Sequence, residues 1–476
     1  MKALIDLLLE PGPDALPADV VVHDADGTTT RAALTESALE VRDALARAGV
    51  ARGTAVAVML GNRAETIAAL FGVWALGAVY VPVNPRLTDR EITLLLDAIT
   101  PAALITTASA AQRFPQREMT SAAGFAIGVA SGPARAHDPD VALVQTTSGT
   151  TGPPRPVPLR HSQVLALLDG VITTFRTATA SDAAGPPMAN LVPVSLSLWA
   201  GIYTVCFAFR VGAPVVLMDH FDPNELARLV AEHQIRSVVL PPAAMAMCCD
   251  EPRLTSLAPL RYVRSITAPL SPFLARRFVD RFGVAVLNGY GQTELGGEVI
   301  GWNAADWREF GETKLGAVGR PHAHVEVRID DGGELWVRTP SSASSASLGD
   351  RLDAEGWLRT GDHARIDDDG FVWIEGRVSD VINRGGLKVF PADVEEVLAT
   401  ATGVREVAVV GIEDARLGEV PVAFVAGTID QELLEAHCRE HLAPYKIPTR
   451  FVEVASLPRN EVGKVLRAEL AQSAMS

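Results

Sequence analysis

The 476-residue sequence predicts an α/β protein, with a large N-terminal body of parallel or mixed sheets and helices and a small α+β C-terminal lid. Two observations predict this architecture. Continuous apolar runs of strand length alternate with amphipathic helices through most of the chain, which is typical of sheets covered on both faces. After about residue 325, short strands separated by Asp-Gly turns take over, and a mixed pattern restarts near residue 391.

The first helix of the body is predicted from the spacing of its apolar residues. Ala38, Val41, Leu45 and Ala48 follow one another at i, i+3, i+7 and i+10, and Gly49 provides a stop. The run at 55–60 has the length and composition of a buried strand. Similar reasoning places helices at 64–76 and at 88–97, and Asn62 is expected to cap the first of them. Strands are expected at 79–81, 102–105, 141–145, 215–218, 237–240 and 284–287.

The later elements are predicted from turns. VEVRID and ELWVR flank DDGG, and HARI and FVWIEGR flank DDDG, so each pair is expected to form a β-hairpin. The last part of the chain is expected to contain helices at 391–400 and 430–442 and strands at 405–410, 421–426 and 451–454. We therefore predict an N-terminal domain at 1–376, a hinge at 377–380 and a C-terminal lid at 381–476. The segment at 108–138 and the serine run at 341–347 are predicted to be loops.

Two uncharged stretches, 66–83 and 191–209, have about the length of a membrane helix. Gly77 and Pro82 interrupt the first, and Pro193 and several hydroxyl residues interrupt the second. Both are therefore expected to be buried helices and strands, and no membrane span is predicted.

The net charge is −15, from 42 Lys and Arg against 57 Asp and Glu, which argues against a nucleic-acid-binding protein. The four cysteines do not have zinc spacing and are too few for a disulfide scaffold. The N-terminal segment lacks the pattern of a signal peptide, so a reduced, cytoplasmic protein is expected.

The sharpest local signal is QTTSGTTGPPR at 145–155, which follows a predicted strand. Glycines let a backbone approach a ligand closely, and hydroxyls and Arg155 add donors, so the loop is suited to phosphate oxygens. It is not a P-loop, because GxxxxGK[ST] is absent. Alone, it is also compatible with an ordinary polar surface loop.

Four further motifs follow in order: NGYGQTE at 288–294, WLRTGDH at 357–363, EGRVSDVINRGGLKVFPADVE at 375–395 and LPRNEVGKVLR at 457–467. With these, and with ALGAVYVPVNPRLT at 75–88, the sequence resembles the adenylate-forming superfamily of acyl-CoA synthetases, peptide-synthetase adenylation domains and luciferases. The resemblance covers essentially the whole chain.

The resemblance implies an enzyme that activates a carboxylic acid with ATP and Mg²⁺ as acyl-AMP and then transfers the acyl group to CoA. It implies catalytic roles for Lys464 at the reacting phosphate, Thr293 at the α-phosphate and Glu294 as the Mg²⁺ ligand. It also implies a nucleotide site formed by Thr147, Ser148, Gly149, Thr150, Thr151, Gly152, Arg155, Thr267, Ala268, Pro269, Asn288, Gly289, Tyr290, Gly291, Asp362 and Arg377. Taken alone, Asp362 is compatible with a turn residue, Glu294 with an N-cap partner, Arg377 with a surface ion pair and Lys464 with a tail lysine.

For the second half-reaction, the resemblance implies rotation of the lid about Ser379. The thiol arm would pass Gly385, Gly386 and Lys388. The family usually has Asp or Lys at the hinge position, so serine is a departure. Arg155 replaces a usual lysine and Pro156 a common glycine, and Leu196 stands where a gate histidine is frequent.

The acid pocket is expected to be lined by uncharged residues, among them Leu196, Trp199, Gly291, Leu295 and Gly296. This favours an apolar medium-chain, cyclic or aromatic acid, although Trp199 could instead shorten the pocket. Arg264 is the nearest basic residue and is expected to be peripheral.

Three alternatives remain at this point. The acyl acceptor could be the phosphopantetheine of an acyl carrier protein. His437 and His441 form an HxxEH pattern that is found in metallopeptidases, although a solvated helix end explains it better. A non-catalytic nucleotide-binding module is the third, and Lys464, Glu294 and Asp362 argue against it.

Overall fold

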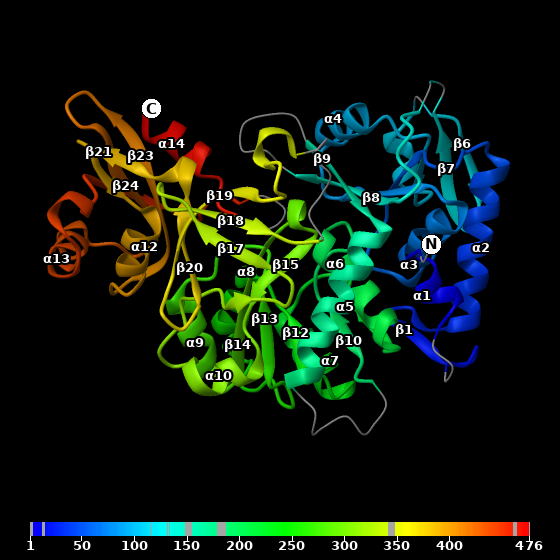
Figure 1. Cartoon of the computed structure of the whole chain (residues 1–476), viewed down its shortest axis with the longest axis horizontal. Helices are drawn as coiled ribbons and strands as arrows, with labels where there is room; N and C mark the ends of the chain where they lie inside the picture. Colours follow the sequence, from blue (N-terminus) through cyan, green and yellow to red (C-terminus); the bar gives the residue numbers. More distant parts are fainter. Residues whose placement is uncertain are drawn as a thin grey trace.

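We describe a computed structural model of the chain (Figure 1). It covers residues 3–11, 15–115, 117–130, 132, 134–147, 155–178, 187–340, 348–459 and 464–475, without the side chains of 147, 174–178 and 475. The N-terminal body contains four sheets and most of the helices, and a smaller C-terminal unit lies at one end (Figure 1). This is the predicted α/β architecture.

The largest sheet has seven strands in the order β6-β7-β5-β3-β4-β8-β9. Its centre is parallel, while β6, β7 and β9 are antiparallel to their neighbours. All five residues of β3 are buried, as the continuous apolar run predicts. The strands are β3 (Ala55–Met59), β4 (Val79–Pro82), β5 (Ala103–Thr106), β6 (Met119–Ala122), β7 (Phe125–Val129), β8 (Val141–Thr147) and β9 (Arg155–Arg160).

Two further sheets complete the α/β part of the body. One has the order β10-β11-β1-β2 and the other β12-β13-β14-β15-β16. Their strands are β1 (Val20–Asp24), β2 (Gly27–Thr30), β10 (Asn190–Val192), β11 (Val215–Leu217), β12 (Ser237–Val239), β13 (Tyr262–Ser265), β14 (Ala285–Gln292), β15 (Gly297–Gly301) and β16 (Arg320–Pro321).

Helices surround these sheets. They are α1 (Asp6–Leu9), α2 (Arg31–Arg47), α3 (Ala64–Leu76), α4 (Asp89–Ile99), α5 (His161–Ala178), α6 (Trp199–Val211), α7 (Pro223–Glu232), α8 (Pro242–Asp250), α9 (Pro272–Phe282) and α10 (Ala304–Phe310). The two uncharged stretches fall on α3 with β4 and on β10 with α6, so both are buried elements, as predicted. Among the described residues, no helix is long and apolar enough to cross a membrane.

The predicted hairpins form an antiparallel sheet with the order β17-β18-β19-β20. Its strands are β17 (Glu326–Ile329), β18 (Glu334–Arg338), β19 (Leu358–Ile366) and β20 (Val372–Arg377). The last strand leads through a short 3₁₀ turn, η4 (Val378–Asp380), into the C-terminal unit.

The C-terminal unit has its own sheet, in which β25 pairs with β24 beside the order β22-β21-β24-β23. It has two hydrophobic clusters of its own, one that includes Ile382 and Val394 and another that includes Phe424. The elements are β21 (Ile382–Arg384), β22 (Leu387–Val389), α12 (Pro391–Ala399), β23 (Val404–Asp414), β24 (Gly418–Gly427), α13 (Gln431–His441), β25 (Arg450–Val454) and α14 (Arg467–Met475).

Two predictions of local structure are wrong. The segment expected to be a loop contains β6 and β7, whose two-residue turn at Ala123 and Gly124 has positive φ at both positions. Asn62 does not cap α3. Its amide group donates to the carbonyls of Val194 and Met218, and its carbonyl oxygen accepts from the amide of Leu196. A side chain committed to three long-range bonds cannot also bind the helix N-terminus.

Candidate active site

The centre of the site is a carboxylate held between two antiparallel strands. Asp362 lies on β19 opposite Arg377 on β20, so the strand register places the two side chains together. Nε of Arg377 lies 2.9 Å from Oδ1 of Asp362. Asp362 is only 5% exposed, whereas the Arg377 side chain is 44% exposed, so the pair has a buried acceptor and an open donor.

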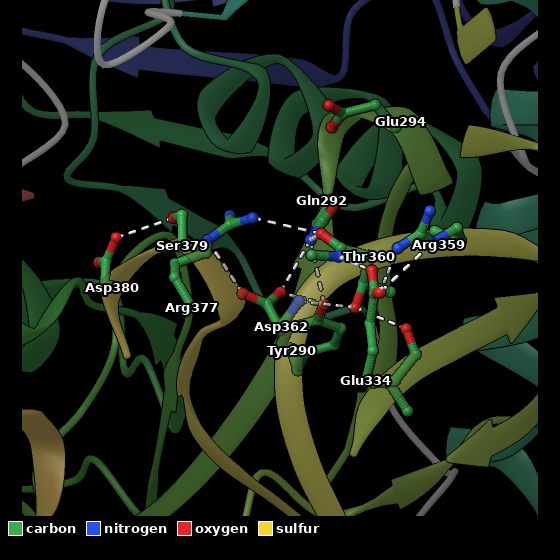
Figure 2. A network of polar contacts seen from close by, with 12 residues as sticks. Tyr290, Gln292, Glu294, Glu334, Arg359, Thr360, Asp362, Arg377, Ser379 and Asp380 are labelled. Carbon is green, nitrogen blue, oxygen red and sulfur yellow. Dashed lines mark hydrogen bonds and ion pairs between the residues drawn. The ribbon is translucent and has the colours of Figure 1, made fainter. Parts of the chain in front are cut away.

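The second oxygen of Asp362 faces the end of β14. The hydroxyl of Tyr290 donates to Oδ2, and the amide nitrogen of Gln292 donates to the same oxygen at 2.8 Å (Figure 2). Burial and then the neighbouring Asp362 charge raise the pKa of Tyr290, so the phenol stays protonated and remains a donor. Three donors therefore hold one buried carboxylate in a single orientation.

Glu294 lies apart from this group, on the 3₁₀ turn η2 (Thr293–Leu295) directly after β14 (Figure 2). Gly296 follows with φ +83°, a conformation suited to glycine, and closes the turn. The amide of Gly296 donates to the carbonyl of Thr293 at 3.0 Å. Thr293 and Glu294 are thereby carried on a tight turn at the edge of the Asp362 cluster.

Lys464 comes from the C-terminal unit and is affected by charges of the N-terminal body. Burial of its ammonium group and the positive charge of Arg377 lower its pKa, and the carboxylates of Asp362 and Glu294 partly oppose that effect. The side chain as a whole still has solvent contact. Arg377, Asp362 and Glu294 of the N-terminal body are therefore close enough to Lys464 to influence its charge.

The two ends of the predicted phosphate loop lie side by side. Thr147 ends β8, and Arg155 begins β9 as its antiparallel partner. Arg155 is exposed. Ser148, Gly149, Thr150, Thr151 and Gly152, and the side chain of Thr147, lie outside the described part of the chain, as does the serine run at 341–347.

The predicted adenine-site backbone lies at the ends of two paired strands. Asn288 and Gly289 are on β14 next to Ser265 on β13, and Thr267, Ala268 and Pro269 follow β13. Thr267 has φ +80°, which is unusual for a β-branched residue, and its buried hydroxyl has no hydrogen-bond partner among the described residues. Strain and an unsatisfied hydroxyl at one position indicate a functional constraint.

Trp199 connects the predicted acid site to the turn that carries Glu294. Its indole nitrogen donates to the carbonyl of Gly296 at 2.8 Å, and its ring packs edge-on against Tyr203. Leu196 and Leu295 are buried in two different hydrophobic clusters. A side chain at Gly291 would collide with the carbonyl of Gly297, so the β14–β15 hairpin itself requires glycine there.

Two residues that the sequence did not indicate, Glu298 and His322, lie beside this region together with Arg264. Glu298 on β15 is paired with Arg264, and its Oε1 accepts from Nε2 of His322 at 2.9 Å. Burial tends to raise the pKa of Glu298, but Arg264 and His322 outweigh it and keep the pKa low. Arg264 is only 13% exposed, and its guanidinium is paired with Glu298. The carboxylate lies against Gly289, beneath the predicted adenine strand.

The residues predicted to contact a thiol arm, Gly385, Gly386 and Lys388, lie on the C-terminal unit. Gly385 and Gly386 form the two-residue turn between β21 and β22, with φ of +61° and +88°. Positive φ at both positions is the requirement of a type I′ hairpin, so the turn alone explains both glycines. Lys388 is exposed on β22, and Ser379 in η4 donates to Asp380 at 2.9 Å.

The HxxEH histidines are accounted for by local contacts. His437 interacts with the hydroxyl of Thr400 and the carbonyl of Val397, and His441 with the carbonyl of His437. Within the described ranges, no group of three or more His, Cys, Asp or Glu side chains is arranged to hold a metal. The peptidase alternative therefore has no support from this helix.

Family models match most of the chain: "AMP-binding enzyme" matches residues 12–345, and "AMP-binding enzyme C-terminal domain" matches residues 393–464. A long-chain-fatty-acid–CoA ligase of Mycobacterium tuberculosis is 29% identical over 95% of this chain and 94% of its own length. A 2-succinylbenzoate–CoA ligase of Geobacillus kaustophilus is 30% identical over 95% of both chains. The solved o-succinylbenzoate CoA synthetase of Bacillus subtilis, in complex with ATP and magnesium ion, is 25% identical and superimposes with a TM-score of 0.81 over 98% of this chain and 99% of that chain.

Proposed function

The chain belongs to the family of AMP-binding enzymes, and we propose that it is an ATP-dependent acid–thiol ligase. It converts a carboxylic acid to acyl-AMP and pyrophosphate, and then exchanges AMP for the thiol of CoA. The observation that carries this proposal is the convergence of Asp362, Arg377, Glu294 and Lys464 from four separate motifs, two strands of one sheet and both structural units. The curated relatives described above are named as CoA ligases.

The polar groups of the cluster suit the parts of a metal–ATP complex. Asp362 is an oriented acceptor for ribose hydroxyls, and the open face of Arg377 lies beside it. Glu294 offers carboxylate oxygens, the ligands that Mg²⁺ prefers. When bound, Mg²⁺ would neutralise phosphate charge. The loop between Thr147 and Arg155 would contact the β- and γ-phosphates, and Thr293 the α-phosphate.

Lys464 is assigned to the reacting centre. A carboxylate that attacks the α-phosphate of ATP brings two negative groups together, and a nearby ammonium stabilises the charge that develops. Its position in the C-terminal unit makes adenylation depend on the orientation of that unit. The present arrangement, with Lys464 near Asp362 and Glu294, corresponds to the adenylate-forming step.

The thiol step requires Lys464 to withdraw. We place the hinge at residues 377–380, between the N-terminal domain at 1–376 and the lid at 381–476, because η4 connects β20 to a unit with its own core. A few residues in a connecting segment are enough to absorb such a rotation. Gly385, Gly386 and Lys388 then form the surface along which the pantetheine arm reaches the acyl-AMP.

The acid is proposed to be an apolar medium-chain, cyclic or aromatic monocarboxylic acid. Trp199 provides a fixed aromatic wall, and Leu196, Leu295 and Gly296 lie on the elements beside it. Arg264 is paired with Glu298, so its charge is already balanced and it is a poor receptor for a second carboxylate. A carrier-protein phosphopantetheine remains the alternative acceptor, because it offers the same thiol arm as CoA.

The proposal is tested by trapping acyl adenylates with hydroxylamine. The purified protein is incubated with ATP, Mg²⁺ and a panel of fatty, alicyclic, aromatic and dicarboxylic acids, and hydroxamate and pyrophosphate are measured. Activity with apolar monocarboxylic acids supports the proposal, and activity confined to dicarboxylic acids contradicts the substrate class. Failure with every acid, while ATP still binds, would favour a non-catalytic nucleotide-binding module. Each accepted acid is then assayed with CoA and with holo carrier protein in parallel.

A matched pair of variants separates chemistry from folding. Lys464→Ala should abolish most hydroxamate formation, whereas His437→Ala in the same C-terminal unit should leave it unchanged. Equal activity in the two variants would remove Lys464 from the reacting centre.

A further inference from the structure

Arg351 lies where no sequence motif indicates a functional residue, yet its guanidinium contacts the candidate metal ligand. Nη1 lies 2.9 Å from Oε1 of Glu294, and Nη2 donates to Oε1 of Gln292 at 2.9 Å. Nε donates to the carbonyl of Arg359 at 3.1 Å. One side chain thus connects Glu294 to the residue that orients Asp362.

The backbone that carries Arg351 is fixed close to Glu294. Arg351 ends the 3₁₀ turn η3 (Gly349–Arg351), and Leu352 forms a bridge with Leu358 at the start of β19. Leu348 and Leu352 pack in the same hydrophobic cluster as Leu295, the residue that follows Glu294. Packing of Leu348 and Leu352 against the cluster of Leu295 therefore holds the Arg351 guanidinium at its distance from the Glu294 carboxylate.

Gln292 extends this connection to the ribose side. Its carbonyl oxygen accepts from Arg351, so its amide nitrogen points the other way and donates to Asp362 and to the carbonyl of Thr360. A flipped amide would place two donors against the guanidinium and an acceptor against a carboxylate. Arg351 therefore fixes the orientation of Gln292 as well as that of Glu294.

We propose that Arg351 is a positioning residue that holds Glu294 and Gln292 in the geometry required for binding the metal–ATP complex. The contact uses one oxygen of Glu294, which leaves the other oxygen as the one to face a cation. Residues that orient a metal ligand commonly change metal affinity by about 10- to 100-fold when removed. The proposal rests on the proposed function, since it assigns Glu294 to the metal of that reaction.

The opposite role makes the opposite prediction. A guanidinium on Glu294 could act as a substitute cation that must leave before the metal enters. In that case, removing Arg351 would tighten metal binding. The positioning role predicts weaker binding, because a triphosphate beside the metal offsets the positive charge of the guanidinium and the carboxylate loses its support.

The test measures Mn²⁺ binding by electron paramagnetic resonance in the presence of saturating α,β-methylene-ATP, an analogue that cannot release pyrophosphate. Arg351→Met is compared with wild type and with Arg338→Met. Arg338 is a good control because its side chain is about as exposed as that of Arg351. It lies on β18 and is paired with Glu326 of the edge strand β17. We expect the Mn²⁺ dissociation constant to rise at least fivefold in Arg351→Met and to stay constant in Arg338→Met.

A lysine variant provides the second readout. Lysine can reach one acceptor but cannot bind Glu294 and Gln292 in parallel, so Arg351→Lys should recover only part of the Mn²⁺ affinity. If Arg351→Met binds Mn²⁺ as tightly as the wild-type protein or more tightly, and forms hydroxamate at the wild-type rate, this inference alone is overturned. Absence of metal-dependent analogue binding in the wild-type protein overturns both the inference and the proposed function.

Discussion

The two sides of the candidate site differ in how completely they are formed before any ligand binds. On the nucleoside side, Asp362 is buried and receives contacts from Tyr290, Gln292 and Arg377 (Figure 2). On the phosphate side, Glu294 is held by Arg351, and Arg155 and Lys464 are exposed. The side that we propose for the nucleoside is therefore preorganised, whereas the side that we propose for the phosphates would be completed by the ligand and by the position of the C-terminal unit.

This difference has a physical explanation. Ribose carries no charge, so its site can be built once, from a buried carboxylate whose charge is balanced by Arg377 and whose orientation is fixed by Tyr290 and Gln292. A triphosphate arrives with its metal and leaves as pyrophosphate during the same cycle. Groups that bind it must be able to release it, and exposed cations on separate units meet that requirement better than a buried network.

Replacing Lys464 by alanine should have the largest effect. The ammonium is assigned to charge that develops only as the acid attacks the phosphate, and loss of one such group costs about 3–4 kcal/mol, or roughly 10²–10³ in rate. Single-turnover hydroxamate formation measures this loss. Binding of ATP, followed by calorimetry, should change little. A rate close to wild type would place the phosphate-side chemistry elsewhere.

Replacing Asp362 by asparagine tests the preorganised side. Hydrogen bonds to a charged acceptor contribute about 1.5–3 kcal/mol, so the KM for ATP should rise roughly 10- to 100-fold. The effect should fall on ATP binding and spare the KM for the acid. Comparison with 2′-deoxy-ATP assigns the lost affinity to the ribose, since an enzyme without its ribose acceptor should no longer distinguish ATP from 2′-deoxy-ATP. Discrimination between ATP and GTP, which depends on the base, should not change.

The pH dependence of adenylation should report the environment of Lys464. Because its pKa is lowered from the ordinary 10.5, the positive charge is lost as pH rises through that lower value. The rate should therefore fall on the alkaline side before pH 10.5. In Lys464→Arg the alkaline limb should move to higher pH, because a guanidinium stays protonated there. Identical limbs in the two proteins would assign the transition to another group.

The smallest effect is expected from remote surface charge. All of the proposed substrates are anions and the net charge is −15, so the long-range field opposes their capture. Neutralising the exposed acids Glu36 and Glu40 of α2 by glutamine should raise the ATP association rate by about twofold at low salt. Stopped-flow measurements at low and high ionic strength test this. An equal gain at both ionic strengths would exclude an electrostatic cause.

The sequence was informative wherever a candidate residue lay in a glycine-containing motif. Tyr290, Glu294, Asp362 and Arg377 belong to such motifs. The structure brings them together because the end of β14 and the end of β20 meet the middle of β19. Gln292 is within one of these motifs and could have been found there, since its amide is the only side chain between Tyr290 and Thr293.

Other contacts could not be inferred from local sequence. Arg351 contacts Glu294, which is 57 residues away, and Glu298 contacts Arg264, which is 34 residues away. The residues that flank them in the sequence do not specify those partners. Asn62 resembles a helix cap because it precedes α3, yet its bonds reach across 132 and 156 residues. Long-range hydrogen bonds depend on how sheets pack, which periodicity and turn signals do not encode.

The indole–carbonyl contact between Trp199 and Gly296 bears on any attempt to redesign the enzyme. The same short turn carries Glu294, our proposed metal ligand, and its Gly296 carbonyl receives the indole of Trp199, our proposed wall of the acid pocket. Enlarging the pocket by truncating Trp199 would release that carbonyl and loosen the metal ligand, so gains in substrate range would come with weaker nucleotide use. Tyr203, one helical turn farther along α6, packs edge-on against the Trp199 ring, so a change at Tyr203 would also alter the support of that indole.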